Sequence, residues 1–231
     1  MPDGDLLLCL DTSTPTARVG IVDGTGALRF ATEATAERHS SHTLALCADA
    51  LKAVGIAPSG LAAVACGGGP GSFTGLRVGL AIAKGLALAN GTPIVLVPSL
   101  EALMLDIDQK VAGLSEVPCI DAGKGEIYAG LGPHPFREPL RVTPEALAAR
   151  VAQEGPCVLA GNGADRHGEL LDRILPPNAR RAAVSGPTAH SIGRVALREH
   201  QCRNYADLDS AVPFYGRLPD ITVKGVKSGV A

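Results

Sequence analysis

Apolar and polar positions alternate in short blocks along the first hundred residues, and the block lengths predict an α/β arrangement. Apolar runs at 5–11 and 17–23 are joined by the polar turn TSTPT, and a third run at 26–34 follows the hairpin signal DGTG. These three runs predict an antiparallel meander. The blocks that follow predict a helix at 41–54, a strand at 61–66, a helix at 73–89 and a strand at 94–99.

The second half of the chain repeats part of this pattern. Residues 117–132 predict a strand, a polar turn and a strand, as residues 6–22 do, and Asp11 and Asp121 each end an apolar run. Further segments are predicted as helices near 100–110, at 143–153 and at 188–200, and as strand, glycine turn and helix over 156–174. The repetition predicts two related lobes, at 1–99 and 100–216, with a tail at 217–231 that is expected to be disordered.

The densest glycine stretch is GGGPGSFTGLRVG at residues 67–79. A phosphate-binding P-loop would need a lysine directly after the loop, but the next lysine is Lys84. A dinucleotide fingerprint would need a glycine where Thr74 stands, and Pro70 removes one backbone donor. The helix N-terminus remains able to attract an anion, but the pattern favours a structural role for these glycines.

The helix predicted at 73–89 contains three glycines, and each costs about 1 kcal/mol relative to alanine. Gly75, Gly79 and Ala83 follow one another at steps of four, so they form a smooth stripe that another backbone could approach closely. The helix is apolar nearly all round, and Arg77 and Lys84 mark its polar edge. One side must therefore face its own sheet. The other side faces the preceding helix of the same chain or another protein, and both readings stay open.

Composition narrows the classes of function. The chain has 231 residues, of which 46% are hydrophobic, so it can bury a sizeable core. Its formal net charge of −2 argues against autonomous binding of nucleic acid. Six cysteines without a C-x-x-C pair indicate free thiols in a reducing compartment. The first residues lack a basic segment, and charges interrupt the longest apolar stretch, so we expect a soluble cytoplasmic protein without membrane contact.

Several motifs together resemble the TsaB family, also called YeaZ. They are GPGSFTGLRVG, DTST at 11–14, RHSSHT at 38–43, IDAGKGEIY at 120–128 and AVPFYGR at 211–217. This family is the bacterial dimerisation subunit of the machinery for tRNA threonylcarbamoyladenosine. The resemblance implies an actin-like ATPase (ASKHA) fold in two lobes, each with a mixed sheet flanked by helices.

The resemblance also implies a vestigial nucleotide site. In the ASKHA superfamily two Asp-containing turns bind phosphates and a glycine motif holds adenosine. The matching positions are all present in weakened form: Asp11, Thr12, Ser13, Thr14, Asp121, Gly123, Gly161 and Gly163. We therefore expect no required cofactor, and the resemblance is compatible with weak ADP or ATP binding.

Neither a metal nor a catalytic residue is expected. The catalytic relative TsaD has a metal-binding His-x-x-x-His, whereas His39 and His42 are three apart with no evident further ligand. The absence of H-E-x-x-H argues against a metallopeptidase. The alternative that remains is an ATP-dependent phosphotransferase or ATPase of the same fold, using Asp11 or Asp121.

The family role is that of a scaffold. TsaB pairs with TsaD through helices of its first lobe, the ATPase TsaE docks on the composite surface, and the free protein forms a homodimer. The complex transfers threonylcarbamoyl to the adenosine 3′ of the anticodon in ANN-decoding tRNAs, so tRNA is an indirect partner. The resemblance and the apolar helix faces together predict this interface: Leu44, Cys47, Leu51, Phe73, Thr74, Gly75, Val78, Gly79, Ile82, Ala83 and Leu86.

Overall fold

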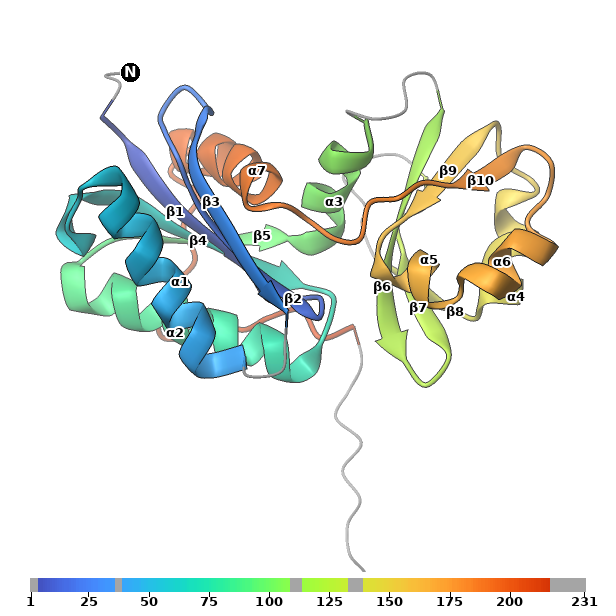
Figure 1. Ribbon diagram of the computed structural model, residues 1–231, viewed down its shortest axis with the longest axis horizontal. Helices are drawn as coiled ribbons and strands as arrows, with labels where there is room; N and C mark the ends of the chain where they lie inside the picture. Colours follow the sequence, from blue (N-terminus) through green and yellow to red (C-terminus); the bar gives the residue numbers. More distant parts are fainter. Residues whose placement is uncertain (1–3, 36–38, 109–113, 133–138, 217–231) are drawn as a thin grey trace, which may run out of the picture.

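Two five-stranded sheets, each flanked by helices, make up the described part of this computed structural model, residues 4–35, 39–108, 114–132 and 139–216 (Figure 1). The first sheet has the order β3-β2-β1-β4-β5, with β1 (Leu6–Asp11), β2 (Thr16–Val22), β3 (Leu28–Thr35), β4 (Leu61–Gly69) and β5 (Ile94–Pro98). The second has the order β10-β9-β6-β7-β8, with β6 (Ser115–Gly123), β7 (Glu126–Ala129), β8 (Leu140–Val142), β9 (Cys157–Ala160) and β10 (Ala179–Arg181).

The two sheets share one topology. In each, the first strand pairs antiparallel with the second, the second antiparallel with the third, and the remaining two strands add in parallel. The first hairpins correspond as well, with Leu10 opposite Val19 in one sheet and Cys119 opposite Ala129 in the other. This confirms the two related lobes predicted from the repeated openings.

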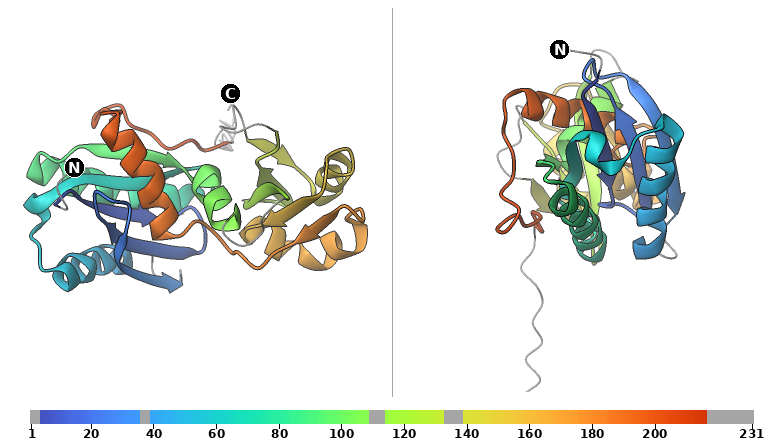
Figure 2. Two further views of the ribbon diagram at one scale, coloured as in Figure 1. Left: turned by 90° about the horizontal axis from the view of Figure 1, so that it is seen from above. Right: turned by 90° about the vertical axis from the view of Figure 1, so that its left-hand side faces the viewer.

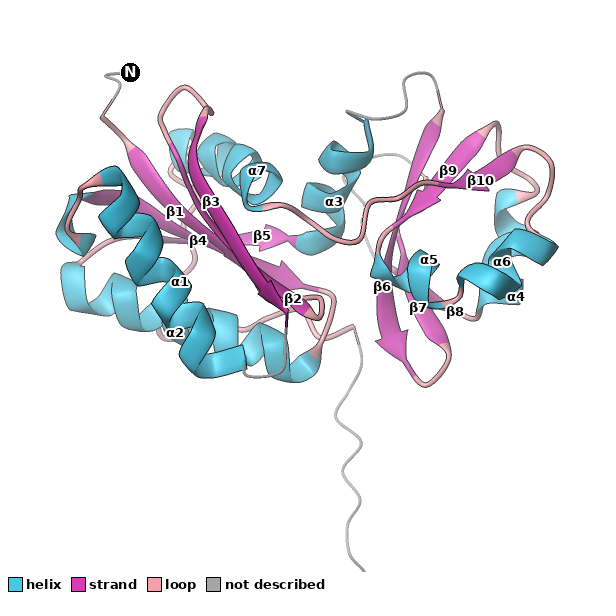
Figure 3. Cartoon of the chain, in the orientation of Figure 1, coloured by secondary structure: helices cyan, strands magenta, loops and turns pink. Residues whose placement is uncertain are grey.

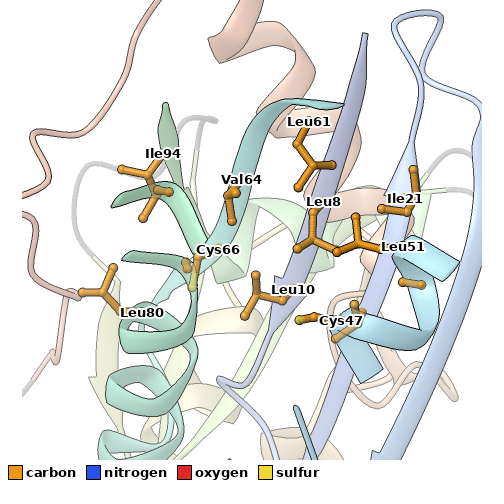
Figure 4. Close-up of a cluster of buried hydrophobic side chains, with 14 residues drawn as sticks. Leu8, Leu10, Ile21, Cys47, Leu51, Leu61, Val64, Cys66, Leu80 and Ile94 are labelled. Carbon is orange, nitrogen blue, oxygen red and sulfur yellow. The ribbon is translucent and has the colours of Figure 1, made fainter. Parts of the chain in front are cut away.

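Helices cover both faces of the first sheet, as Figure 3 shows. On one face lie α1 (His39–Val54) and α2 (Phe73–Asn90). Leu8, Leu10 and Val64 of the sheet pack there against Cys47 of α1 and Leu80 of α2 (Figure 4). The strands β1 and β4 are buried on both faces, which explains why their sequences are continuously apolar.

The opposite face of the first sheet is covered by the last helix, α7 (Ala189–Gln201). Its Ile192 and Val195 pack against Leu7 and Cys9. Figure 2 shows the chain returning from the second lobe to reach this position. The chain then continues along the first lobe, where the Ala206 N–H donates to the Ile94 carbonyl. The arrangement differs from the predicted division at 100–216, because α7 packs on the first sheet, and Ala206 and Phe214 bond to its strands β5 and β4.

The second lobe is smaller, and α3 (Ser99–Asp108) lies between it and the first (Figure 1). Leu103 and Ile107 of α3 are buried against Ile120 and Val158 of the second sheet. The other face of this sheet packs against helices α4 (Pro144–Val151), α5 (Asn162–Arg166) and α6 (Gly168–Ile174). A 3-10 turn, Pro58–Gly60, precedes β4.

The predicted helices and strands are confirmed with shifts of one to a few residues at their ends. Strands β8 and β10 were not predicted. Among the described residues, no helix combines the length and apolar character that crossing a lipid bilayer requires. The tail predicted at 217–231 lies outside the described residues.

Candidate functional site

The turn after β1 holds the first predicted phosphate motif, and its side chains face the protein's own interior. Asp11, Thr12, Ser13 and Thr14 are all buried. One Asp11 carboxylate oxygen accepts hydrogen bonds from the Ser13 N–H (3.0 Å) and hydroxyl (2.7 Å), and the other accepts from the Ser99 hydroxyl at 3.3 Å. The carboxylate is therefore engaged within the chain.

Glycine residues of β4 and of the loop that follows it close over this turn. A Cβ added at Gly67 would overlap the Asp11 carboxylate, and one at Gly71 would overlap Ser13. Burial raises the pKa of Asp11 to about 6, although the hydrogen bonds from Ser13 oppose this shift. Asp11 is fully buried, so neither of its carboxylate oxygens is exposed to solvent in this structure.

The second predicted motif is more open but is also internally paired. One Asp121 carboxylate oxygen accepts from Arg166 at 2.8 Å, and the other accepts from the Gly123 N–H at 3.1 Å. Gly161 and Gly163 pack directly against β6, where an added Cβ would overlap backbone atoms of Cys119 and Ile120. These glycines therefore fit close packing of α5 on the second sheet.

A cavity of about 310 Å³ lies at the carboxyl ends of β4 and β5. Such crevices are common ligand sites in α/β proteins. Its walls are mainly apolar, with Leu96, Val212 and Phe214 among them, and Glu101 supplies the only carboxylate among the described lining residues. Arg198 pairs with that carboxylate. The lining residues thus provide no pair of groups for acid–base catalysis.

The predicted interface residues divide into two sets. Cys47, Leu51 and Ala83 are buried within the first lobe's own core, so they cannot contact a partner. Gly75 and Gly79 are buried against the turn after β1, where an added Cβ would overlap the Thr12 carbonyl and hydroxyl respectively. The predicted smooth stripe therefore packs inside this chain, which explains its glycines without a partner.

The Thr12 turn makes this close packing specific. The Thr12 hydroxyl donates to the Gly75 carbonyl at 2.8 Å, and the Ser72 N–H donates to the Ser13 carbonyl at 2.8 Å. The Ser72 hydroxyl also caps α2 by accepting from the Gly75 N–H. The Ser-Phe-Thr-Gly segment thus joins the glycine loop, the helix start and the first turn.

The remaining predicted interface residues are accessible on the outer side of the two helices. Leu44 of α1 and Phe73 of α2 are 52% and 44% exposed. The other accessible predicted positions are Thr74, which is exposed, and Val78, Ile82 and Leu86, which are half-buried. These six residues are the part of the prediction that leaves room for a partner.

Helix α2 carries a second row of small residues that was not predicted from the sequence. Ala81, Gly85 and Ala89 also follow one another at steps of four, and all three are exposed. A Cβ at Gly85 would meet nothing within 4 Å. Leu88, beside this row, is 77% exposed. We call Val78, Ala81, Ile82, Gly85, Leu88 and Ala89 the outer face of α2.

The possible metal ligands are only partly described. His42 is exposed, but the side chain of His39 lies outside the described part of the structure. Within the described residues, no group of three or more His, Cys, Asp or Glu side chains could hold a metal ion. That His39 and His42 bind no metal therefore stays a prediction.

A family model and several known proteins are similar to this chain. Residues 31–148 match the family model described as TsaD, tRNA N6-adenosine threonylcarbamoyltransferase. The chain is 35% identical to the tRNA threonylcarbamoyladenosine biosynthesis protein TsaB of Escherichia coli, over 53% of this chain and 52% of that protein. It thus spans about half the length of that relative. The TsaB protein of Bacillus subtilis is 25% identical over 96% of this chain and 98% of its own length.

Solved structures agree in fold. YeaZ from Pseudomonas aeruginosa superposes with a TM-score of 0.76 and 25% identity, over 91% of this chain and 99% of that chain. A dehydratase activator from Clostridium difficile has a TM-score of 0.53 at 8% identity, which concerns the fold alone. The two lobes with related mixed sheets are thus those of the actin-like (ASKHA) fold. The chain belongs to the TsaB (YeaZ) family of tRNA threonylcarbamoyladenosine biosynthesis proteins.

Proposed function

We propose that this chain is a non-catalytic subunit in the synthesis of threonylcarbamoyladenosine on ANN-decoding tRNAs, and that it pairs with a TsaD homologue. The observation that supports the pairing is the outer face of α2. Gly85 is exposed in the middle of a helix, where glycine costs about 1 kcal/mol relative to alanine. No neighbour among the residues that the structure describes explains it, since an added Cβ would meet nothing there within 4 Å.

Close approach of another backbone gives Gly85 a physical reason. A partner helix that crosses α2 at Ala81, Gly85 and Ala89 can come nearer than one that meets larger side chains. Leu88 and the half-buried Val78 and Ile82 then supply the apolar contact area around the crossing point. In the free protein the same face can pair with a second copy, which accounts for a homodimer.

Two further features support a scaffold rather than an enzyme. Asp11 and Asp121, the carboxylates that the ATPase alternative would use, are both held by groups of the same chain. The net charge of −2 is consistent with tRNA being held mainly by the partners. We propose that the TsaE ATPase docks on the composite surface and that this chain requires no cofactor of its own.

The pairing is tested by replacing Gly85 with arginine. Because the position is open, the variant folds normally, but the bulky charge blocks close approach of an apolar helix. We expect the Kd for the co-expressed TsaD homologue to rise by roughly ten-fold or more, with a matching loss of tRNA modification in a reconstituted assay. Size-exclusion chromatography and calorimetric titration measure the pairing.

The matched control is Ala149→Arg, at an exposed position of α4 in the second lobe. It adds the same side chain to a helix surface far from the outer face of α2, and should leave pairing unchanged. Equal affinities for Gly85→Arg and the parent chain would show that the partner binds elsewhere.

A further inference from the structure

Helix α3 connects the two lobes, because each of its sides packs against a different one. Leu100, Leu103 and Ile107 are buried in a cluster with residues of the second sheet. Ala102, on another side, is buried in the cluster formed by α7 and the first sheet. The position of α3 on α7 therefore sets how the second lobe lies against the first.

Two carboxylates of α3 are buried where it meets α7. Glu101 and Asp106 are 7% and 8% exposed. Arg198 pairs with Glu101 near the end of α7, while Asp106 reaches the start of that helix. Carboxylates are seldom buried without partners, because removing their charge from water is costly. Their placement at both ends of the contact indicates a specific attachment.

Asp106 makes the more extensive attachment. One of its oxygens accepts from the Thr188 hydroxyl at 2.8 Å, and the other accepts from the Thr188 N–H at 2.8 Å and the Ser191 hydroxyl at 2.6 Å. Three donors from one helix start thus converge on a single side chain. We call Asp106, Thr188 and Ser191 the clasp.

Helix α7 is itself fixed to the first lobe. Its Gly193 lies so close to β2 that an added Cβ would overlap the Val22 side chain. The clasp therefore joins a helix that cannot shift on the first sheet to a helix that is buried in the second lobe. A groove of about 710 Å³ lies beside it, lined by Arg18 and Glu33 of the first lobe and by Asp106 and Thr188 of the clasp.

We infer that the clasp locks the two lobes in one orientation. Two-lobed proteins commonly rotate about the segments that join their lobes, and small changes at such joints give large displacements. Here the joint is held by hydrogen bonds to a buried carboxylate, which are stronger and more directional than contacts between neutral groups. Loss of the clasp should free the lobes to rotate without unfolding either core.

The test measures the distance between the lobes in the full chain, and needs no partner. One spin label is placed on Cys202, the exposed cysteine that follows α7, and a second on a cysteine introduced by Glu169→Cys on α6. The other five cysteines are buried and resist labelling. Pulsed electron spin resonance then gives the distribution of distances.

The Asp106→Asn variant tests the clasp directly. Its amide nitrogen cannot accept a hydrogen bond, so at least one of the three donors loses its acceptor. We expect the distance distribution to widen by about two-fold or more, and amide hydrogen exchange in the first turn of α7 to rise. Asp172→Asn is the matched control, because that carboxylate pairs with Arg181 within the second lobe. It should leave the distribution unchanged.

The variants Thr188→Val and Ser191→Ala are milder tests of the clasp and can be used if Asp106→Asn does not fold. Each removes one hydroxyl donor, and each should widen the distribution by a smaller amount. If these variants lower the unfolding temperature while the distances stay as narrow as in the parent chain, Asp106 only stabilises α7 and the inferred lock is wrong.

Discussion

At the scale of single residues, Asp11 shows how a motif position can be engaged within the protein's own structure. Its position at the end of the first strand is that of a phosphate-binding residue in the ASKHA fold. Here its oxygens accept hydrogen bonds from Ser13 and Ser99, and Gly67 leaves no space beside it. The residue thus joins the first turn to the start of α3.

The raised pKa of Asp11 predicts a particular pH dependence of stability. Its pKa in the folded chain is about 6, against 3.8 for the unconstrained group. The folded state therefore holds this proton more tightly than the unfolded state, so the free energy of unfolding falls as pH rises from about 4 to above 6. The shift corresponds to ~3 kcal/mol over that range.

The side chain of Asp11→Asn cannot ionise. The variant should therefore lose this contribution to the change of unfolding free energy with pH. Urea unfolding of both proteins at pH 4, 5.5 and 7 measures the difference, and the parent chain should lose stability relative to the variant as pH rises. If the free energies of unfolding of the two proteins changed with pH in parallel, a buried Asp11 with a raised pKa would be contradicted.

At the scale of elements, α2 presents two rows of small residues with different partners. The inner row contains Gly75 and Gly79, which contact the turn after β1, and the outer row contains Gly85. The interface predicted from the sequence combined the inner row with accessible residues such as Val78 and Ile82, and it did not include Gly85. A helix that is apolar nearly all round gives no periodic signal to distinguish its inner from its outer side.

Replacing Gly79 or Gly85 with alanine should change the free energy of unfolding of the isolated chain in opposite directions. At Gly79 the new methyl group would overlap the Thr12 hydroxyl, so we expect a loss of roughly 1–3 kcal/mol in the free energy of unfolding. At Gly85 the space is open, so the higher helix propensity of alanine should add up to about 1 kcal/mol. Denaturant unfolding of the Gly79→Ala and Gly85→Ala variants measures both changes in the free energy of unfolding. Changes of the same sign would mean that the rows are assigned to the wrong sides.

Other elements were predictable to different degrees. The long strands and helices follow from their apolar runs and cap residues, such as Thr143 before α4 and Thr188 before α7. Strands β8 and β10 have three residues each, which is too short for an alternating pattern to appear. The return of α7 to the first sheet depends on contacts distant in sequence, so the order of elements alone placed it in the wrong lobe.

At the scale of the whole molecule, both Asp-containing turns, one in each lobe, are engaged within the chain. The first turn is enclosed, and the second is engaged with Arg166. The clasp adds a further restriction, because nucleotide-dependent closure in two-lobed proteins requires the lobes to move.

We therefore expect no tight binding of magnesium-ATP to the isolated chain. Calorimetric titration should give no heat of binding at low micromolar nucleotide and no turnover. A Kd in that range together with ATP hydrolysis would support the phosphotransferase or ATPase alternative. Asp11→Asn and Asp121→Asn would then distinguish which turn contributes.

The placement of α7 has a consequence for how the molecule is made. Because α7 belongs to the first lobe, the ribosome synthesises the entire second lobe before the helix that covers Leu7 and Cys9. Until then one side of the N-terminal sheet stays open to water, and nascent chains are most exposed to aggregation at that face. Truncation upstream of residue 189 would make this transient state permanent.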